Sequence, residues 1–160
     1  IYYVADDAQT KELSYTVEYY KDGVKVDEDV ERTTVQLLAP SKMTVNKDKI
    51  NIQDKYEGYY FDSTEPNVIP DTIANKGVIK VNYIIRNDLS YVVNYLEEGT
   101  NIQLANSKIV EGKTYQSEVT ETSIDIFGYS KVNEQETIRI NIENNIINFY
   151  LGTSNNICYD

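Results

Sequence analysis

The same short pattern occurs twice in this chain, and this internal repeat constrains the fold more than any other feature. Residues 13–19 read Leu-Ser-Tyr-Thr-Val-Glu-Tyr, and residues 89–95 read Leu-Ser-Tyr-Val-Val-Asn-Tyr. In both copies Tyr, Val and Tyr occupy alternate positions, which is typical of a β-strand with one buried face. Self-similarity of this kind indicates tandem copies of one structural unit. We therefore expect two small modules along the chain.

Two further landmarks follow the opening strand in the same order in both copies. A turn comes first, as Lys21-Asp22-Gly23 in one copy and Glu97-Glu98-Gly99 in the other. Asp-Gly between alternating apolar residues is a strong signal for a β-hairpin. A Gly-Tyr pair comes next, at Gly58-Tyr59 and Gly128-Tyr129, and leads into an extended stretch. Each module is thus predicted to open with a hairpin and to continue with a strand after Gly-Tyr.

Each copy is predicted to end in an apolar strand. The two strands are residues 78–84 and residues 146–151, and each follows a tight polar turn. Such a run after a turn signal is typical of a buried strand. The two closing strands can be aligned in two ways that differ by one residue, and we match Tyr83 with Tyr150.

The ends of the chain extend the repeat. Ile1-Tyr2-Tyr3-Val4 resembles a closing strand, and Ile157-Cys158-Tyr159 stands where a further opening strand would begin. We therefore divide the chain into residues 1–12, the end of a preceding repeat and a linker; 13–87, the first module; 88–152, the second module; and 153–160, a linker or the start of a further repeat. The joint near Asn87-Asp88 is short and lacks Gly and Pro, so we expect an elongated, fairly stiff arrangement.

Composition favours β-structure throughout. The chain has 15 Tyr, 3 Phe and no Trp, together with many Ile and Val. Aromatic and β-branched residues suit a pleated, half-buried surface. One segment in each copy, residues 41–53 and residues 115–124, is the place for a short helix or a loop. The expected fold class is α+β and predominantly β.

The order of these motifs resembles the mucin-binding-protein (MucBP) type repeats of Gram-positive cell-wall-anchored surface proteins. The resemblance spans residues 13–151 and departs from the family pattern between Val35 and Tyr56, where the first copy is longer. It implies two tandem small β-grasp (ubiquitin-like) modules in an elongated arrangement. The residues that carry it are Val17-Glu18-Tyr19, Val93-Asn94-Tyr95, Gly58-Tyr59, Gly128-Tyr129, Val81-Asn82-Tyr83 and Asn148-Phe149-Tyr150.

Charge and composition argue against several functions. The formal net charge of −11 would repel both nucleic acid and an anionic membrane surface. The chain has no His and a single Cys, Cys158, which removes the commonest general base, a disulfide framework and a structural zinc site. Acidic runs such as Asp27-Glu28-Asp29 lack the spacing of a calcium loop. We therefore expect no enzyme, no catalytic residue, no cofactor and no metal site.

Tyrosines are the candidates for ligand binding. Tyr20, Tyr60 and also Tyr59 are expected on the face opposite the core, or near a loop. Exposed aromatic rings beside amides and carboxylates can form a shallow sugar site. Tyr59, Tyr60 and Phe61 are therefore the predicted ligand-binding residues. The alternative is a hydrophobic patch that covers the hairpin.

The resemblance implies a non-catalytic repeat segment of a bacterial cell-surface protein, acting as an adhesin or stalk with weak multivalent binding to host glycoprotein. Expected partners are host mucin or other glycans and neighbouring repeats of the same chain. Nucleic acid and membrane insertion are not expected, and the chain is expected to be a monomer on the extracellular face of the cell wall. The alternative is a discrete carbohydrate-binding module with a Tyr-lined site, which would gather its exposed aromatic residues in a concavity.

Overall fold

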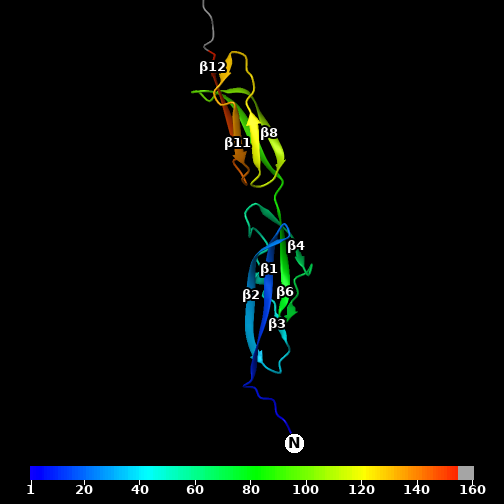
Figure 1. Cartoon of the computed structure of the whole chain (residues 1–160). Helices are drawn as coiled ribbons and strands as arrows, with labels where there is room; N and C mark the ends of the chain where they lie inside the picture. Colours follow the sequence, from blue (N-terminus) through cyan, green and yellow to red (C-terminus); the bar gives the residue numbers. More distant parts are fainter. Residues whose placement is uncertain (155–160) are drawn as a thin grey trace, which may run out of the picture. The chain divides into compact units, whose positions relative to one another are not determined.

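The structure is a computed structural model of the chain, and it describes residues 1–154. The chain divides into two compact units, one of Ile1–Ile85 and one that begins at Arg86 (Figure 1). Strands make up most of both units, as predicted. The first unit contains β1 (Thr10–Lys21), β2 (Val24–Gln36), β3 (Lys42–Thr44), the short 3-10 helix η1 (Lys47–Lys49), β4 (Tyr59–Glu65), β5 (Thr72–Ala74) and β6 (Gly77–Ile85). The second contains β7 (Leu89–Glu97), β8 (Gln103–Lys113), β9 (Glu118–Thr122), β10 (Tyr129–Lys131), β11 (Gln135–Arg139) and β12 (Ile146–Thr153).

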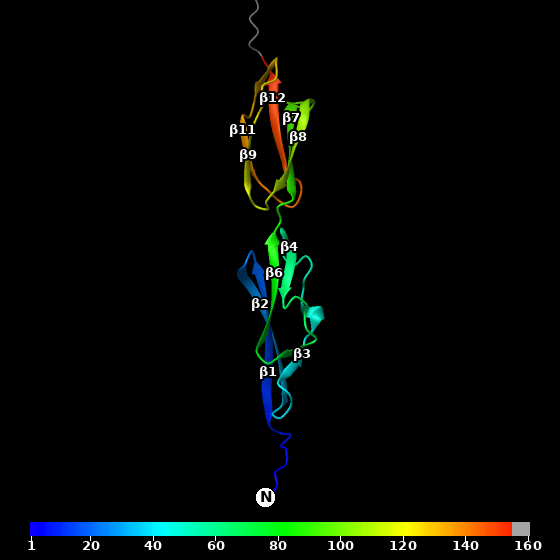
Figure 2. The same ribbon diagram turned by 90° about the vertical axis from the view of Figure 1, so that its right-hand side faces the viewer.

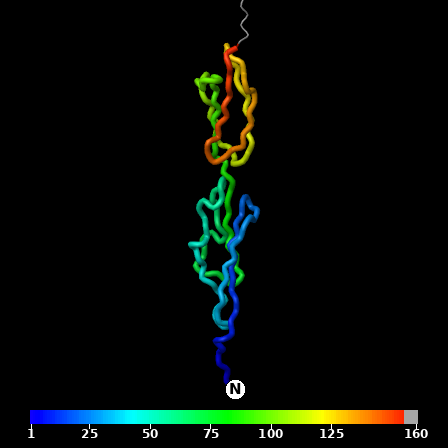
Figure 3. The backbone as a smooth tube through the Cα atoms, turned by 90° about the vertical axis from the view of Figure 1, so that its left-hand side faces the viewer, coloured from blue at the N-terminus to red at the C-terminus, as the bar shows by residue number. Residues whose placement is uncertain are grey.

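The first unit is built on a mixed four-stranded sheet with the order β2-β1-β6-β4. β1 and β2 form an antiparallel hairpin, and β4 pairs antiparallel with β6. The first and last strands, β1 and β6, lie parallel in the middle of the sheet. Figure 3 follows this path from the opening hairpin in blue to the closing strand in green. The short strands β3 and β5 form a separate antiparallel pair.

The second unit repeats this arrangement. Its sheet has the order β10-β12-β7-β8, with β7 and β12 parallel in the middle. A second antiparallel pair, β9 and β11, lies beside this sheet as a separate layer (Figure 2). The correspondence is therefore β1 with β7, β2 with β8, β4 with β10 and β6 with β12.

Buried and more exposed side chains alternate along the central strands, and this alternation shows which face of each sheet forms the core. In β1 the side chains of Leu13, Tyr15, Val17 and Tyr19 are buried, and the residues between them are not. β7 has the same pattern, as predicted from the repeated Tyr-x-Val-x-Tyr motif. The first core contains Leu13, Tyr15, Val17, Tyr19, Met43, Val45, Ile50, Ile79, Val81 and Tyr83. The second contains Leu89, Tyr91, Val93, Tyr95, Val119, Ile140, Ile147, Phe149 and Leu151.

The predicted turns are present in both units. Asp22 and Gly23 join β1 to β2 with φ angles of 48° and 81°, as the two-residue hairpin turn requires. Gly58 and Gly128 precede β4 and β10 with φ angles of 80° and 85°, a region that glycine enters without steric cost. Each lies in a turn closed by the amide of the following Tyr, which donates to the carbonyl three residues earlier.

The predicted match of Tyr83 with Tyr150 is wrong by one residue. Val17 lies opposite Ile79 in the first unit, and its counterpart Val93 lies opposite Ile147 in the second. Tyr83 therefore corresponds to Leu151. Because β-strand side chains alternate between faces, Tyr150 faces away from the core that buries Leu151.

The two segments predicted to form a short helix or a loop contain strands. Residues 41–53 include β3 and η1, and residues 115–124 include β9. No α-helix occurs in residues 1–154, so the α part of the expected fold class is not found there. β9 is extended because each of its residues pairs with one of β11, and the hydroxyls of Thr120 and Thr137 lie 2.7 Å apart across the pair.

The ends differ in part from expectation. Residues 10–12, predicted to be linker, belong to β1 because β2 is long enough to pair Thr10 with Gln36. Residues 1–4, predicted to be the end of a preceding repeat, lie outside any strand and are exposed. The further opening strand predicted at Ile157-Cys158-Tyr159 lies outside the described residues.

Candidate functional site

The three predicted ligand-binding residues lie together on β4, an edge strand of the first sheet. Tyr59, Tyr60 and Phe61 pair with Ile85, Ile84 and Tyr83 of β6. Strand alternation sends their side chains to different faces. Tyr59 packs against the core, and the Phe61 ring lies 6.2 Å from the ring of buried Tyr83 in an edge-to-face arrangement. Tyr60, 44% exposed, faces the other way, so the three rings do not form one surface.

On the core side, an aromatic cluster occupies the end of the sheet nearest the β1–β2 turn. The Tyr56 ring lies 5.1 Å from Tyr83 and 6.5 Å from Tyr19, both edge-to-face. Two lysines cover these rings. The Lys21 Nζ lies 4.5 Å from the Tyr56 centroid and 4.7 Å from the Tyr59 centroid, and the Lys55 Nζ lies 4.1 Å from the Tyr19 centroid.

Cation–π contacts of this length are attractive. They place the chain's own ammonium groups on the ring faces that a sugar would otherwise stack against. Of the two places expected for Tyr59, the face opposite the core is therefore wrong, because its ring packs against the core and Lys21. Tyr59 does lie beside a loop, directly after the turn at Gly58.

Burial keeps the cluster uncharged. Burial raises the pKa of Tyr19 to about 12, and the nearby carboxylate of Asp29 adds to the effect. Burial also raises the pKa of Tyr83 to about 12, while its hydroxyl donates to the Asn51 carbonyl at 2.6 Å. The cluster thus consists of neutral rings with cations at its rim, which is a structural arrangement rather than a reactive one.

The opposite, outer face of the first sheet presents the other two candidate tyrosines, as predicted. Tyr20 of β1 pairs with Asn82 of β6, and Tyr60 of β4 pairs with the neighbouring outward residue Ile84. Since β6 lies between β1 and β4, and Asn82 and Ile84 are two residues apart along it, the two tyrosines are about 12 Å apart on this face. The Asn82 Nδ2 between them donates to the Ser63 hydroxyl at 3.3 Å. This outer face therefore combines the exposed Tyr60 ring and the half-buried Tyr20 ring with an amide and a hydroxyl.

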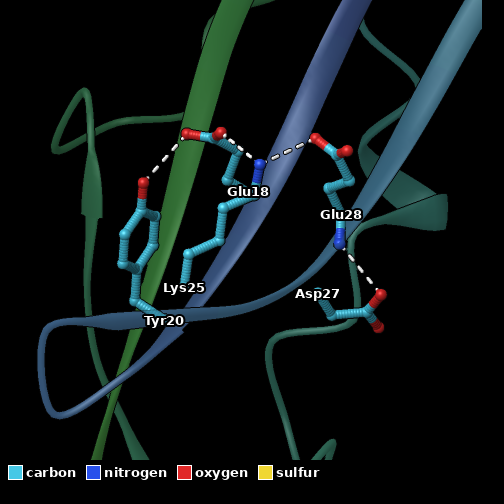
Figure 4. A network of polar contacts seen from close by, with 5 residues as sticks. All are labelled: Glu18, Tyr20, Lys25, Asp27 and Glu28. Carbon is cyan, nitrogen blue, oxygen red and sulfur yellow. Dashed lines mark hydrogen bonds and ion pairs between the residues drawn. The ribbon is translucent and has the colours of Figure 1, made fainter.

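A polar network occupies the Tyr20 side of this face (Figure 4). Lys25 Nζ lies 2.8 Å from Glu18 Oε2 and 2.9 Å from Glu28 Oε2. The Tyr20 hydroxyl donates to Glu18 Oε1 at 3.0 Å. The hydrogen bond from Lys25 holds the pKa of Glu18 below its ordinary value, with a further contribution from Tyr20. A single ammonium group, that of Lys25, therefore joins two carboxylates of the sheet.

The cavities lie elsewhere. One of about 440 Å³ in the second unit is lined by β11 and β12 with Val132 and Asn133. Another, of about 560 Å³, lies in the first unit beside η1 and is lined by Thr44, Val45, Asn46, Lys47, Asp48 and Asp71. Neither includes a predicted ligand-binding residue. No sequence motif marks the first cavity, because it arises where β10 ends at Lys131, whereas β4 of the first unit continues to Glu65.

Two further properties hold for the part of the chain that the structure describes. No three His, Cys, Asp or Glu side chains in residues 1–154 gather into a group suited to holding a metal ion. Within the same residues, no helix has the length and apolar character needed to cross a bilayer.

No family model matches the chain, and no curated protein matches it. Several solved structures are similar to it. Mub-RV is 14% identical, covers 89% of this chain and 99% of its own, and has a TM-score of 0.34. The type 2 repeat of the mucus binding protein MUB from Lactobacillus reuteri is 11% identical, with coverages of 89% and 100% and a TM-score of 0.32. Domains 3-4 of the Streptococcal High Identity Repeats in Tandem (SHIRT) from a cell surface protein are 10% identical, with coverages of 89% and 98% and a TM-score of 0.37.

A mucus-binding repeat and surface-protein repeat domains, the kinds of repeat that the motifs resemble, are thus among the structures similar to this chain.

Proposed function

We propose that this chain is a non-catalytic repeat segment of a bacterial cell-surface protein whose main task is to form a framework that transmits tension. The observation that carries the proposal is what the two units share. Residues repeated in both copies lie mainly in the core, as Tyr15 with Tyr91, or in turns, as Gly58 with Gly128. The outward residue Tyr60 corresponds instead to Ser130. A position repeated in both copies serves what both copies have in common, which is the scaffold.

The direction of the strands suits a segment held at both ends. β1 is the first strand of its unit and β6 the last, and the two are parallel neighbours. The chain therefore enters the unit at one end of the sheet and leaves it at the other. Tension on the termini loads all the hydrogen bonds between β1 and β6 in shear, so they must break together. β7 and β12 have the same relation in the second unit.

Single-molecule pulling tests this role. Stretching the chain by its ends should give two unfolding events, one for each unit. The control attaches the handles through Val24→Cys and Asn87→Cys in a Cys158→Ser background, near the same end of the first sheet. That geometry opens the bonds one after another, and we expect the unfolding force of the first unit to fall at least twofold. Equal forces in the two geometries would contradict the proposal.

We further propose that each unit is a β-grasp module in which a short strand pair stands in the place of the helix. A mixed sheet with its first and last strands parallel in the middle, flanked by one antiparallel strand on each side, supports this proposal. The elongated arrangement of two modules joined near Asn87-Asp88 remains a prediction. Small-angle scattering would test it, and a compact scattering profile would contradict it.

Weak glycan binding is the second candidate function, and the outer face of the first sheet favours it. Tyr20 and Tyr60 flank an amide and a hydroxyl there, a combination that suits sugar CH groups and hydroxyls. Linked weak sites gain avidity when repeats are joined. Saturation-transfer NMR with mucin O-glycans should detect contacts that Tyr60→Ala removes and that Ser130→Ala, the matched change in the second unit, leaves intact. No saturation transfer to the parent chain would exclude this candidate.

A further inference from the structure

The closing strand of the second unit has an edge that its own chain covers only in part. β10 has three residues and pairs with Leu151–Thr153 of β12. The Val132 amide then donates to the Tyr150 carbonyl at 2.9 Å. Beyond this point the backbone leaves the sheet, and β11 pairs with β9 instead.

The side chain of Asn133 takes the place of one missing peptide group. Its Oδ1 accepts a hydrogen bond from the Tyr150 amide at 2.8 Å, and its Nδ2 donates to the Asn148 carbonyl at 3.0 Å. The same Nδ2 lies 3.0 Å from Glu136 Oε1. A side-chain amide has the donor and acceptor of a peptide group, so Asn133 extends the pairing by one step and no further.

The remaining edge offers hydrogen-bonding groups to a further strand. Along a strand, the N–H and C=O of every second residue point to the same edge. The Tyr150 groups point to the β10 side, so those of Asn148 and Ile146 do as well. Within residues 1–154, no strand pairs with this side of β12 at the residues that precede Leu151. The Asn148 amide and both backbone groups of Ile146 therefore face the groove.

The groove beside this edge has the lining that an extended peptide needs. Its volume is about 440 Å³, and it lies between β11 and β12. Val132, Ile138 and Ile146 supply apolar walls, with Ile146 49% exposed. Glu136 supplies a carboxylate to the lining. Apolar walls and one carboxylate suit a strand that carries an apolar and a basic side chain.

The first unit shows what occupies the equivalent edge. There β4 continues past its bulge, and Ser63, Thr64 and Glu65 pair antiparallel with Asn82, Val81 and Lys80 of β6. These β6 residues correspond to Tyr150, Phe149 and Asn148 of β12 by the registers described above. At these three positions the first unit fills the edge with its own strand, whereas in the second the side chain of Asn133 takes the place of a strand within residues 1–154. Neither Val78 nor Ile146 has a strand partner on this side in the described residues.

We propose that the open edge of β12 binds an extended peptide segment of another polypeptide as an added antiparallel strand that continues β10. Main-chain hydrogen bonds to Ile146 and Asn148 provide the attachment, as in other cases of strand addition. Side chains at alternate positions of the peptide provide selectivity, with a basic residue beside Glu136 and a β-branched residue against Ile138. This inference is independent of the framework role proposed above.

An NMR titration of the whole chain tests the proposal with the capped peptide Thr-Lys-Thr-Val-Thr. Its Lys and Val are two residues apart, as Glu136 and Ile138 are. We expect saturable shifts at the Ile146 and Asn148 amides, slower exchange of both amide protons, and a dissociation constant on the order of 1 mM. A peptide with the same side chains and N-methylated alternate amides should lose at least tenfold in affinity, because it cannot complete the strand pairing.

Two matched variants make the test specific. Ile146→Asp places a charge at the groove and should weaken binding at least fivefold. Val78→Asp, at the corresponding and similarly exposed position of the first unit, should leave binding unchanged. Amide spectra of the free variants establish that both remain folded. Shifts confined to other residues, equal binding of the N-methylated peptide, self-association in place of peptide binding, or no binding at all would overturn the proposal.

Discussion

The two units keep the same sheet and register but fill their cores differently. Val81 and Tyr83 of β6 correspond to Phe149 and Leu151 of β12, and all four are buried. In the first unit the larger residue of the pair is the second one, Tyr83. In the second unit the larger residue is the first one, Phe149. Hydrophobic cores tolerate exchanges that keep total volume and pattern. The comparison teaches that the repeat preserves positions and faces rather than residue identities.

The polar partners of the shared tyrosines also differ. The Tyr15 hydroxyl accepts a hydrogen bond from the Asn46 amide at 3.1 Å. Its counterpart, the Tyr91 hydroxyl, donates to Glu121 at 2.5 Å, and Lys108 pairs with the same carboxylate at 2.8 Å. Burial alone would raise the pKa of Glu121, but hydrogen bonds from Lys108 and Tyr91 outweigh it and lower that pKa. One position thus contacts the backbone in one unit and an ion pair in the other.

The largest effect is expected for Tyr91→Ala. It removes a ring that is 4% exposed and leaves the partly buried Glu121 without one donor. A large-to-small change of this kind costs about 4 kcal/mol, as much as a small module has to lose. The second unit should unfold while the first stays folded, and amide spectra recorded during thermal melts would resolve the two.

The matched change Tyr15→Ala should unfold the first unit in the same way. Tyr91→Phe, which keeps the ring and removes the hydroxyl, should cost much less than Tyr91→Ala. A Tyr91→Ala protein with the melting curve of the parent would show that the core assignment of this position is wrong.

The second largest effect is expected at alkaline pH, which should destabilise the two units to different extents. Folding raises the pKa of Tyr19 and Tyr83 in the first unit, and of Tyr91 in the second, from 10.0 to about 12. Their stabilisation is fully present below pH 10 and is lost as the pH rises toward 12, because the unfolded chain releases these protons first. Each group contributes on the order of 3 kcal/mol. Tyr56 and Tyr129 shift in the same direction, one in each unit.

The first unit, with two strongly shifted groups against one, should therefore lose more free energy of unfolding between pH 10 and 12. Urea unfolding at a series of pH values, read separately for each unit, measures this. Tyr83→Phe provides the control, since it should reduce the pH dependence of the first unit alone. A steeper loss in the second unit would contradict the assignment.

A smaller effect is expected for Asn133→Ala. It leaves the Tyr150 amide and the Asn148 carbonyl without their side-chain partner, which costs about 1–2 kcal/mol. Ser63→Ala in the first unit should cost less than about 0.5 kcal/mol, because backbone pairing already covers the edge there. Denaturant midpoints of the two variants decide the matter, and equal losses would mean that the two edges do not differ as described.

The smallest effect is expected for Tyr60→Ala. Its ring is exposed on an edge strand, and Ser130 fills the same place in the second unit. The free energy of unfolding should change by less than about 1 kcal/mol, and Ser130→Tyr should be equally mild. Loss of folding on Tyr60→Ala would reverse our assignment of inward and outward faces.

The parts of the fold that depend on local pattern could be predicted from the sequence. The Tyr-x-Val-x-Tyr strands, the Asp22-Gly23 hairpin and the Gly-Tyr landmarks all have a period or a turn chemistry that neighbouring residues reveal. The register between the two closing strands could not be predicted from local pattern. It depends on parallel pairing with β1 and β7, residues far away in sequence, and an apolar run such as residues 146–151 does not indicate it.

The candidate site was harder to predict for a similar reason. Alternation indicated that Tyr20 and Tyr60 lie outside, but it could not reveal that Lys21 covers Tyr59 or that Phe61 packs against Tyr83. Those contacts join three strands that are far apart in the sequence. The edge of β12 was missed altogether, because an open edge results from where another strand ends, and no motif marks that point.

The parallel pairing of first and last strands also governs when each unit can fold as the chain is made. Tyr15 lies opposite Gly77, and Val93 lies opposite Ile147. During synthesis the opening hairpin can form early, but the sheet stays without its central pair until the final strand has emerged. Long-range closure of this kind makes folding slow. A nascent unit therefore remains unfolded for most of its elongation and is completed by its last strand, so that a chain cut off before β6 or β12 lacks the central strand pair of that unit.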